Sequence, residues 1–254
     1  MKLAANAFLA GLRSGTPQIG LWSSLAHNFA AEAIAGAGYD WVLIDMEHSP
    51  NDLQSVLAQL QVFAAYDTTA LVRPAWNDAV MVKQLLDAGA PGLLFPMVQS
   101  EAEAGAAVAA CRYPPRGVRG VSGTTRANKF GRVTDYFSRI ETETAILVQV
   151  ETEQAVNRAT EIGAMDGVDG VFFGPADIAA DLGLLGQPLH PDVWAVIMPA
   201  ATALIKAGIP VGTLVMDHDF ARDLIADGFG FVACGSDAGL LTTGADQLLA
   251  RMRS

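Results

Sequence analysis

The sequence predicts a (β/α)8 barrel, also called a TIM barrel, with residues 1–254 forming a single domain. Short apolar runs recur eight times along the chain, and such runs are typical of strands buried on both faces of a parallel sheet. Each run is followed by a polar or Gly/Pro corner and a helical pattern, which favours a closed barrel over an open doubly wound sheet. A length of 254 residues with 51% hydrophobic content matches one such barrel.

The expected strands lie at residues 19–22, 41–45, 70–73, 92–96, 146–150, 170–173, 211–215 and 231–234. Between them the pattern predicts helices near residues 28–37, 51–65, 77–88, 100–110, 152–161, 191–207 and 217–227. Two of these helices have clear starts at Asn51-Asp52 and Asn77-Asp78, and glycines are expected to end four helices, at Gly38, Gly89, Gly208 and Gly228.

Three segments depart from this alternation. Asn6 and Arg13 interrupt the first apolar stretch, so we expect a short amphipathic lead-in helix there and not a signal peptide. Residues 112–140 are too long for an ordinary connection, which is typical of a functional loop. Beyond Ser236 one more helix is expected near residues 244–252, free to cover the barrel or to cross to a neighbouring subunit.

The composition of the chain argues against several classes of binding partner. A formal charge of −11 and the absence of a Lys/Arg stripe make nucleic acid and anionic membrane surfaces poor partners. No stretch approaches the ~18 uncharged apolar residues of a membrane span. The two cysteines, Cys111 and Cys234, have neither disulfide-framework nor metal-site spacing, which favours a reducing compartment. The sequence therefore predicts a cytoplasmic protein that acts on small molecules.

Most of the unusual polar residues fall at the carboxyl ends of the expected strands, where an α/β barrel gathers its reactive groups. The residues at or just beyond these ends are Trp22, Asp45, His48, Arg73, Gln149, Glu151, the stretch Gly174-Pro175-Ala176-Asp177, and Leu214. Because these ends share one rim, the sequence predicts a single mouth that holds the active site.

Glu151 and Asp177 follow adjacent expected strands, so their carboxylates can converge on one point of this mouth. Two oxygen ligands without a nearby Cys or a further His suit a hard cation with open positions for water and substrate, which indicates Mg2+, Mn2+ or Co2+. The alternative is that both residues serve helix starts, Glu151 as an anion at a helix N-terminus and Asp177 as a cap. The amides of Ala176 and Asp177 can in addition donate to a substrate carboxylate.

Arg73 ends a strand and is followed by Pro74, which places a permanent charge where a barrel usually has a neutral side chain. A guanidinium beside a metal stabilises an enolate oxygen as it gains charge, and the alternative is a salt bridge to Asp45 or Glu151. His48 lies in the short loop after Asp45, where an imidazole can exchange protons at neutral pH.

Two other mechanisms find no support in the sequence. A Schiff-base aldolase needs a lysine in the mouth, yet Lys2 and Lys129 lie off the strands, and Lys83 and Lys206 lie within expected helices. No Gly-rich phosphate loop of Walker or dinucleotide type is present, so no nucleotide cofactor is expected.

These residues, in this order, resemble the pyruvate-class II aldolases typified by 4-hydroxy-2-oxoheptanedioate aldolase and 2-dehydro-3-deoxyglucarate aldolase. The resemblance covers nearly the whole chain. It rests on the stretches Pro17-Gln18-Ile19-Gly20-Leu21-Trp22, Asp45-Met46-Glu47-His48, Val72-Arg73-Pro74 with Trp76-Asn77-Asp78, Phe95-Pro96-Met97-Val98, Arg112-Tyr113-Pro114-Pro115, Gly117-Val118-Arg119-Gly120, Gln149-Val150-Glu151-Thr152 and Gly174-Pro175-Ala176-Asp177.

The resemblance implies a role for each matching residue. His48 would be the catalytic base, Arg73 would stabilise the transition state, and Glu151 and Asp177 would hold the metal. Gln149, Gly174 and Ala176 would contact the substrate, whereas Trp22 and Leu214 would line the aldehyde side.

Asp87 would raise the basicity of the histidine, although it ends a helix facing the bottom of the barrel and reaches a mouth only across a subunit contact. Asp45 is the intrachain alternative partner of His48. The loop Ser122-Gly123-Thr124-Thr125-Arg126 departs from the family pattern.

The function expected from these observations is reversible aldol cleavage of a 4-hydroxy-2-oxo acid to pyruvate and an aldehyde, through a metal-stabilised pyruvate enolate. The resemblance further implies a homohexamer with an exchanged terminal helix. Two alternatives stay open at this point. One is another enolate-forming lyase acting on an oxo acid or a thioester, and the other is a non-catalytic barrel that binds a metal or an oxo acid.

Overall fold

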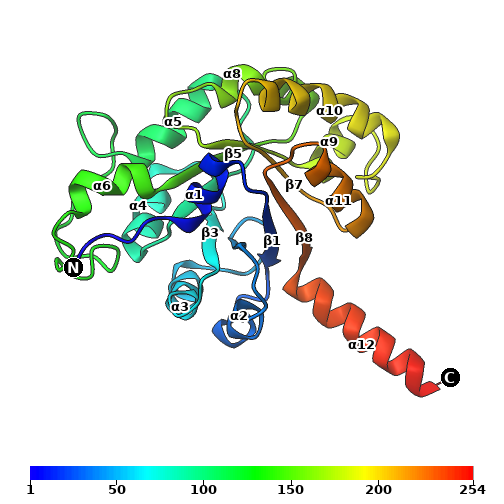
Figure 1. The fold of residues 1–254 in the computed structure, drawn as a ribbon, viewed down its shortest axis with the longest axis horizontal. Coiled ribbons are helices and arrows are strands. Elements are labelled where there is room, and N and C mark those ends of the chain that lie inside the picture. The colour runs from blue at the N-terminus through cyan, green and yellow to red at the C-terminus, as the bar shows by residue number, and fades with distance from the viewer. Residues whose placement is uncertain (254) are drawn as a thin grey trace.

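The computed structural model describes residues 1–253 and shows a closed barrel of eight parallel strands in the order β1 to β8 (Figure 1). The strands are β1 Gln18–Ser23, β2 Trp41–Asp45, β3 Thr69–Arg73, β4 Gly92–Phe95, β5 Ala145–Val150, β6 Gly170–Phe173, β7 Val211–Leu214 and β8 Phe231–Ser236. Every expected strand is present within two residues at each end, because the apolar runs that predict them are buried on both faces. The barrel closes where β1 pairs with β8.

The helices between the strands cover the outside of the barrel, and one further helix precedes the first strand and another follows the last (Figure 1). They are α1 Ala7–Ser14, α2 Asn28–Ala35, α3 Leu53–Phe63, α4 Ala79–Ala88, α5 Glu101–Cys111, α6 Tyr136–Glu143, α7 Glu153–Val156, α8 Ala159–Gly163, α9 Pro175–Asp181, α10 Pro191–Lys206, α11 His218–Ala226 and α12 Asp237–Arg253. The predicted starts hold, since Asp52 and Asp78 accept hydrogen bonds from the third residues of α3 and α4.

Three helix predictions need correction. The single helix expected at residues 152–161 is two short helices, α7 and α8, interrupted at Asn157 and Arg158. The long segment 112–140 contains the start of a helix, α6, that the sequence pattern missed. The last helix begins at Asp237 and not near residue 244, because the buried Asp237 carboxylate accepts the amide of Ala238 as well as those of Ser24 and Leu25. Gly239 and Gly244 weaken the helical pattern of that segment.

The lead-in helix α1 closes the amino-terminal end of the barrel. Phe8 is fully buried and packs edge-to-face on Trp41 and Phe231, with ring centroids 5.8 Å away in each case. These rings belong to the apolar cluster inside the barrel, which extends to Trp22 and Phe172 near the opposite end. The interior is therefore a packed core, and only the carboxyl end of the barrel is left for a site.

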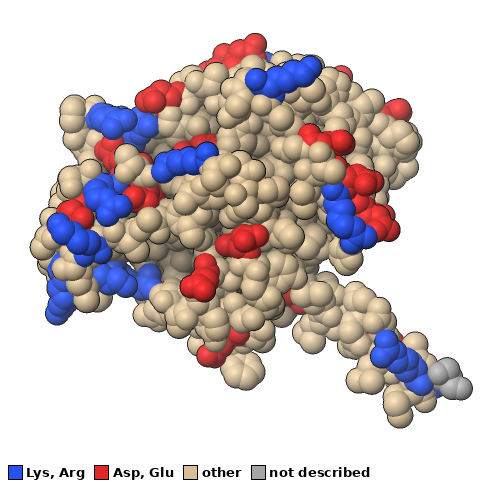
Figure 2. Space-filling model, in the orientation of Figure 1, with Lys and Arg blue, Asp and Glu red and all other residues tan. Residues whose placement is uncertain are grey.

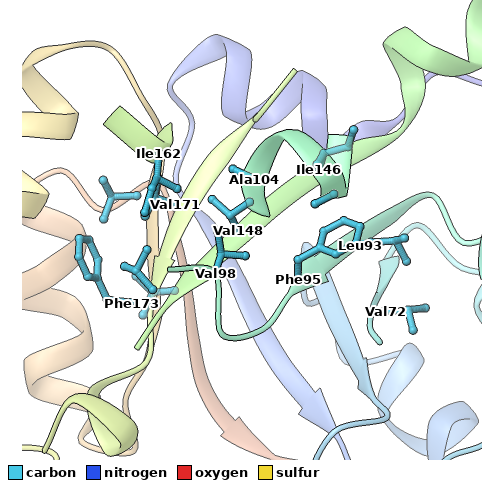
Figure 3. Close-up of a cluster of buried hydrophobic side chains, with 14 of the residues drawn as sticks. Val72, Leu93, Phe95, Val98, Ala104, Ile146, Val148, Ile162, Val171 and Phe173 are labelled. Atoms are coloured by element: carbon cyan, nitrogen blue, oxygen red, sulfur yellow. The ribbon is translucent and has the colours of Figure 1, made fainter. Parts of the chain in front are cut away.

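A second, larger apolar layer lies between the strands and the outer helices. Figure 3 shows its part around β4, β5 and β6, where Phe95, Val148 and Phe173 point outward and Ala104 and Ile162 lie on the covering helices. Alternate residues of each strand therefore pack inward and outward, as a barrel requires.

Helix α12 does not join this outer layer and projects from the barrel (Figure 1). Asp237 is its only buried residue, and five large apolar side chains are exposed on it, at Leu240, Leu241, Leu248, Leu249 and Met252. In Figure 2 the projecting helix is mostly uncharged before its tip, where Arg251 and Arg253 lie. None of the helices described for residues 1–253 is long and apolar enough to cross a membrane.

Gly20 allows β1 to pass close to the inner rings, because a Cβ built there would lie 2.2 Å from the Trp41 ring. We expect Gly20→Ala to lower the free energy of unfolding by about 1–3 kcal/mol through overpacking. Urea unfolding measures this loss. The control is Gly123→Ala, where a Cβ meets nothing within 4 Å, and equal stability of the two variants would contradict the packing argument.

Candidate active site

A cavity of about 360 Å³ opens at the carboxyl end of the barrel. It brings together most residues that the sequence placed on one rim: Trp22, His48, Arg73, Gln149, Gly174, Ala176, Asp177 and Leu214 all line it. Glu151 is buried behind the wall residue Gly174, since a Cβ built on Gly174 would come within 2.8 Å of Glu151 Oε1. Only a glycine at position 174 leaves this carboxylate in its place.

Arg73 is held by a two-point hydrogen bond to Asp45. The Nε and Nη2 groups of Arg73 donate to Asp45 Oδ1 and Oδ2 at 2.8 and 2.9 Å, and both side chains are buried. The two residues are direct neighbours in the register of β2 and β3. The guanidinium also lies 5.5 Å from the centre of the Trp22 ring. Its orientation is therefore fixed before any substrate enters.

The loop after β2 is tied back to the strand end. Ser49 Oγ and Asn51 Nδ2 donate to the carbonyl of Asp45, and the amide of Glu47 donates to Asp45 Oδ1. These bonds place His48 at the mouth, where 65% of its side chain is exposed. An imidazole in this position can reach both solvent and a bound substrate.

Glu47 is a site residue that sequence reasoning missed. Its Oε2 lies 2.9 Å from Arg73 Nη1 and 3.8 Å from His48 Nε2, and 13% of the side chain is exposed. The contact with Arg73 meets the distance of an ion pair but lacks hydrogen-bond geometry, so this buried oxygen has no hydrogen-bond donor. Burial raises the pKa of Glu47, against the opposing effect of Arg73. The only signal in the sequence was its place between Asp45 and His48.

Glu151 is a buried carboxylate with 1% of its surface exposed. Its Oε2 accepts the amide of Met97 at 2.7 Å, and its Oε1 accepts Gln149 Nε2. Met97 has φ 53, a left-handed conformation that is rare for residues other than glycine and that accompanies this amide contact. Burial raises the pKa of Glu151 to about 8, and repulsion from Asp177 and Glu47 adds to this shift.

Asp177 and Glu47 therefore lie close enough to Glu151 to raise its pKa, and the amide oxygen of Gln149 is one further oxygen in the same environment. Asp177 lies in the first turn of α9 on the cavity wall. The buried Gln149 Oε1 and Glu47 Oε2 have no hydrogen-bond donor. Among residues 1–253 no three His, Cys, Asp or Glu side chains gather closely enough to hold a metal alone. The oxygen-rich, donor-poor mouth therefore fits a hard cation with two protein carboxylates and open positions for other ligands.

Comparison with known proteins identifies the family of this chain. Residues 18–243 match the HpcH/HpaI aldolase/citrate lyase family. The chain belongs to this family. It is 52% identical over 251 residues to a pyruvate aldolase of Rhizobium etli, covering 99% of both chains. It is 49% identical over 247 residues to a 4-hydroxy-2-oxo-heptane-1,7-dioate aldolase of Salmonella dublin, covering 97% of this chain and 94% of that one.

The fold is shared with solved members of the HpcH/HpaI family. A family protein from Burkholderia cenocepacia J2315 has a TM-score of 0.95 and 40% identity, covering 98% of this chain and all of that one. The chain is therefore a carbon–carbon lyase of the aldolase type. Within one chain of this HpcH/HpaI protein, neither Asp45 nor Asp87 contacts His48, and the Asp87 contact expected across a subunit boundary stays a prediction.

Asp45 does not contact His48, because Arg73 and the amide of Glu47 take both of its oxygens. Glu47 is the carboxylate next to the imidazole instead. Asp87 lies at the end of α4 and pairs with the buried Arg119 at 2.7 Å. This pair lies away from the mouth, so within one chain Asp87 has no contact with His48.

The raised pKa of Glu151 predicts that the free energy of unfolding of the metal-free protein, measured in chelator, depends on pH. Its pKa in the folded protein, about 8, lies above the ordinary value of 4.5, so its contribution to stability is full below the lower value and is lost as pH rises through the higher one. We expect metal-free protein to lose stability as pH rises from about 4.5 to about 8, and Glu151→Gln to lose less. Urea unfolding in EDTA measures both. Parallel pH curves for the two proteins would refute the assignment.

Proposed function

We propose that this HpcH/HpaI chain is a divalent-metal-dependent aldolase that reversibly cleaves 4-hydroxy-2-oxo acids to pyruvate and an aldehyde. The observation that supports it is one cavity lined by a fixed guanidinium, an accessible imidazole and the Asp177 carboxylate, with the buried Glu151 next to its wall. The names of the Rhizobium etli and Salmonella dublin relatives describe this kind of reaction. Pyruvate and the aldehyde are the small-molecule partners.

Glu151 and Asp177 would hold the metal, with Mg2+, Mn2+ or Co2+ as the matching ions. The donor set of two carboxylates leaves room for water and for the two oxygens of an oxo acid. When bound, such a cation supplies positive charge beside the pyruvate oxygens and so favours the enolate. Gln149 orients Glu151 through its amide and lines the cavity, where Ala176 and Gly174 also face the substrate.

His48 would move the proton. In the synthetic direction the methyl proton of pyruvate passes to the imidazole, the methyl carbon bonds to the aldehyde carbon, and the aldehyde oxygen takes up a proton. Cleavage runs the same steps in reverse. Arg73 would stabilise the oxygen that gains negative charge, and its hydrogen bonds to Asp45 keep it in position throughout. No lysine enters this scheme, so no Schiff base is needed.

We also propose a cytoplasmic homo-oligomer, a hexamer, in which α12 is exchanged between subunits. The exposed leucines of α12 need a partner surface. An outer groove beside β1 and β8 is lined by Ile19, Leu21, Val232 and Cys234, and the projecting helix contributes to this lining only through Leu240, near its start. A neighbour's α12 would fill such a groove. Subunit contacts of this kind are also the only route by which Asp87 would approach a histidine.

We expect Leu241→Asp with Leu248→Asp to dissociate the oligomer, because two charges would enter an apolar contact. Size-exclusion chromatography with light scattering measures the mass. Leu185→Asp is the control, since Leu185 is 81% exposed on another part of the surface. An unchanged mass for the double variant would refute exchange of α12.

Exchange of the pyruvate methyl protons in heavy water tests the proposed function without any aldehyde. We expect exchange with added Mn2+, none in chelator, and a loss of about two orders of magnitude or more in Asp177→Ala. Proton NMR follows the methyl signal. Asp217→Ala is the control, because this carboxylate caps α11 and does not line the cavity. Full exchange in chelator would contradict the metal assignment.

A further inference from the structure

Glu47 is a buried acidic residue that the proposed reaction does not yet use. Its Oε2 lies 2.9 Å from Arg73 Nη1 and 3.8 Å from His48 Nε2, so one oxygen is within ion-pair distance of both basic groups. Glu47 is not among the residues that line the active-site cavity, whereas His48 and Arg73 both line it. Any effect of Glu47 on a substrate in the cavity therefore passes through these two neighbours.

The His48 side chain has few other restraints. It is 65% exposed, and in the part of the chain that the structure describes its one polar contact is with Glu47 Oε2. The backbone of the loop is fixed instead, because the amide of Glu47 donates to Asp45 Oδ1 at 3.0 Å and Asn51 Nδ2 donates to the Asp45 carbonyl at 2.8 Å. Glu47 is thus a fixed carboxylate beside a largely exposed ring.

Arg73 does not depend on Glu47 for its position. Its Nε and Nη2 groups already donate to the two oxygens of Asp45. The contact between Nη1 and Glu47 lacks hydrogen-bond geometry, and the buried Oε2 of Glu47 has no hydrogen-bond donor. Because a buried acceptor without a donor is costly, this oxygen has an unused position that an imidazole N–H can fill.

Proton transfer to His48 creates a second positive charge beside Arg73, and repulsion between the two cations disfavours the protonated imidazole. Burial raises the pKa of Glu47, with additions from Asp45 and Asp177, whereas Arg73 and His48 lower it. A proton on His48 therefore favours the ionised form of Glu47. Because such coupling is reciprocal, an ionised Glu47 favours the proton on His48 to the same extent.

We propose that Glu47 is a positioning residue for His48 and serves as the counter-ion of the protonated imidazole. This inference rests on the proposed function and adds one residue to its proton-transfer step. The methyl proton of pyruvate passes to a nitrogen of His48, and the electron pair of the broken C–H bond stays with pyruvate as its enolate. The imidazolium then forms an ion pair with Glu47 Oε2. Within one chain, Glu47 takes the place that was expected for Asp45.

The direction of the effect separates this role from a role through Arg73. Removing the negative charge of Glu47 leaves the guanidinium less neutralised, which would favour pyruvate binding and the enolate. The same change leaves the protonated imidazole of His48 without its counter-ion, which would slow proton transfer. A fall in kcat without a rise in KM therefore points to His48.

Glu47→Gln tests the inference in the exchange of pyruvate methyl protons with saturating Mn2+. We expect kcat to fall by about tenfold or more, with KM for pyruvate unchanged or lower. Glu47→Asp keeps a carboxylate and should recover most of this loss. An unchanged kcat in Glu47→Gln, a rise in KM by the same factor, or an aspartate variant no better than the glutamine variant would overturn the inference. Urea unfolding confirms that both variants fold, and Glu47→Ala replaces a glutamine variant that does not.

Glu153→Gln is the matched control. Glu153 is exposed in the first turn of α7, which follows β5, so this variant loses the same charge at the same end of the barrel without a contact to His48. An equal fall in kcat in the control would assign the effect to net charge and refute the role of Glu47. The unsubstituted protein is measured in parallel. No exchange there would overturn the proposed function, whereas exchange that Glu47→Gln leaves unchanged would overturn this inference alone.

Discussion

Repulsion among carboxylates at the mouth of the barrel is the constraint on which the site depends. Glu151 is buried, and Asp177 and Glu47 face it closely enough to raise its pKa. The protein places a backbone amide, a side-chain amide and an arginine around these groups, yet two buried oxygens still lack donors. The proposed hard cation would resolve this arrangement, because it would supply the missing positive charge beside these carboxylates.

The geometry of the barrel brings these side chains to one end of the molecule. Closure through β1 and β8 brings all eight carboxyl ends to one opening, while α1 seals the other end with Phe8. Arg73 and Asp45 are neighbours in the register of β2 and β3, so the sheet itself aligns the two-point hydrogen bond between them. His48 belongs to a short loop tied to the strand end, which leaves it exposed but positioned. The fixed guanidinium at the strand end and the exposed imidazole of the loop therefore belong to separate elements.

Much of this was predictable from the sequence, for physical reasons. Strands such as β2 and β6 read as continuous apolar runs because both faces are buried, and residues at their ends must share the mouth. The role of Glu47 was not predictable, because the direction of a side chain in a loop depends on contacts made by Asp45 and Arg73. The start of α12 was missed because tertiary hydrogen bonds to Asp237 outweigh its local glycines.

The most direct test is anomalous diffraction from crystals grown with Mn2+ and pyruvate. We expect one manganese peak between the carboxylates of Glu151 and Asp177, next to the cavity that Arg73 and His48 line. A peak at any other group of side chains, or pyruvate bound at this mouth with no manganese beside it, would contradict the proposed metal site.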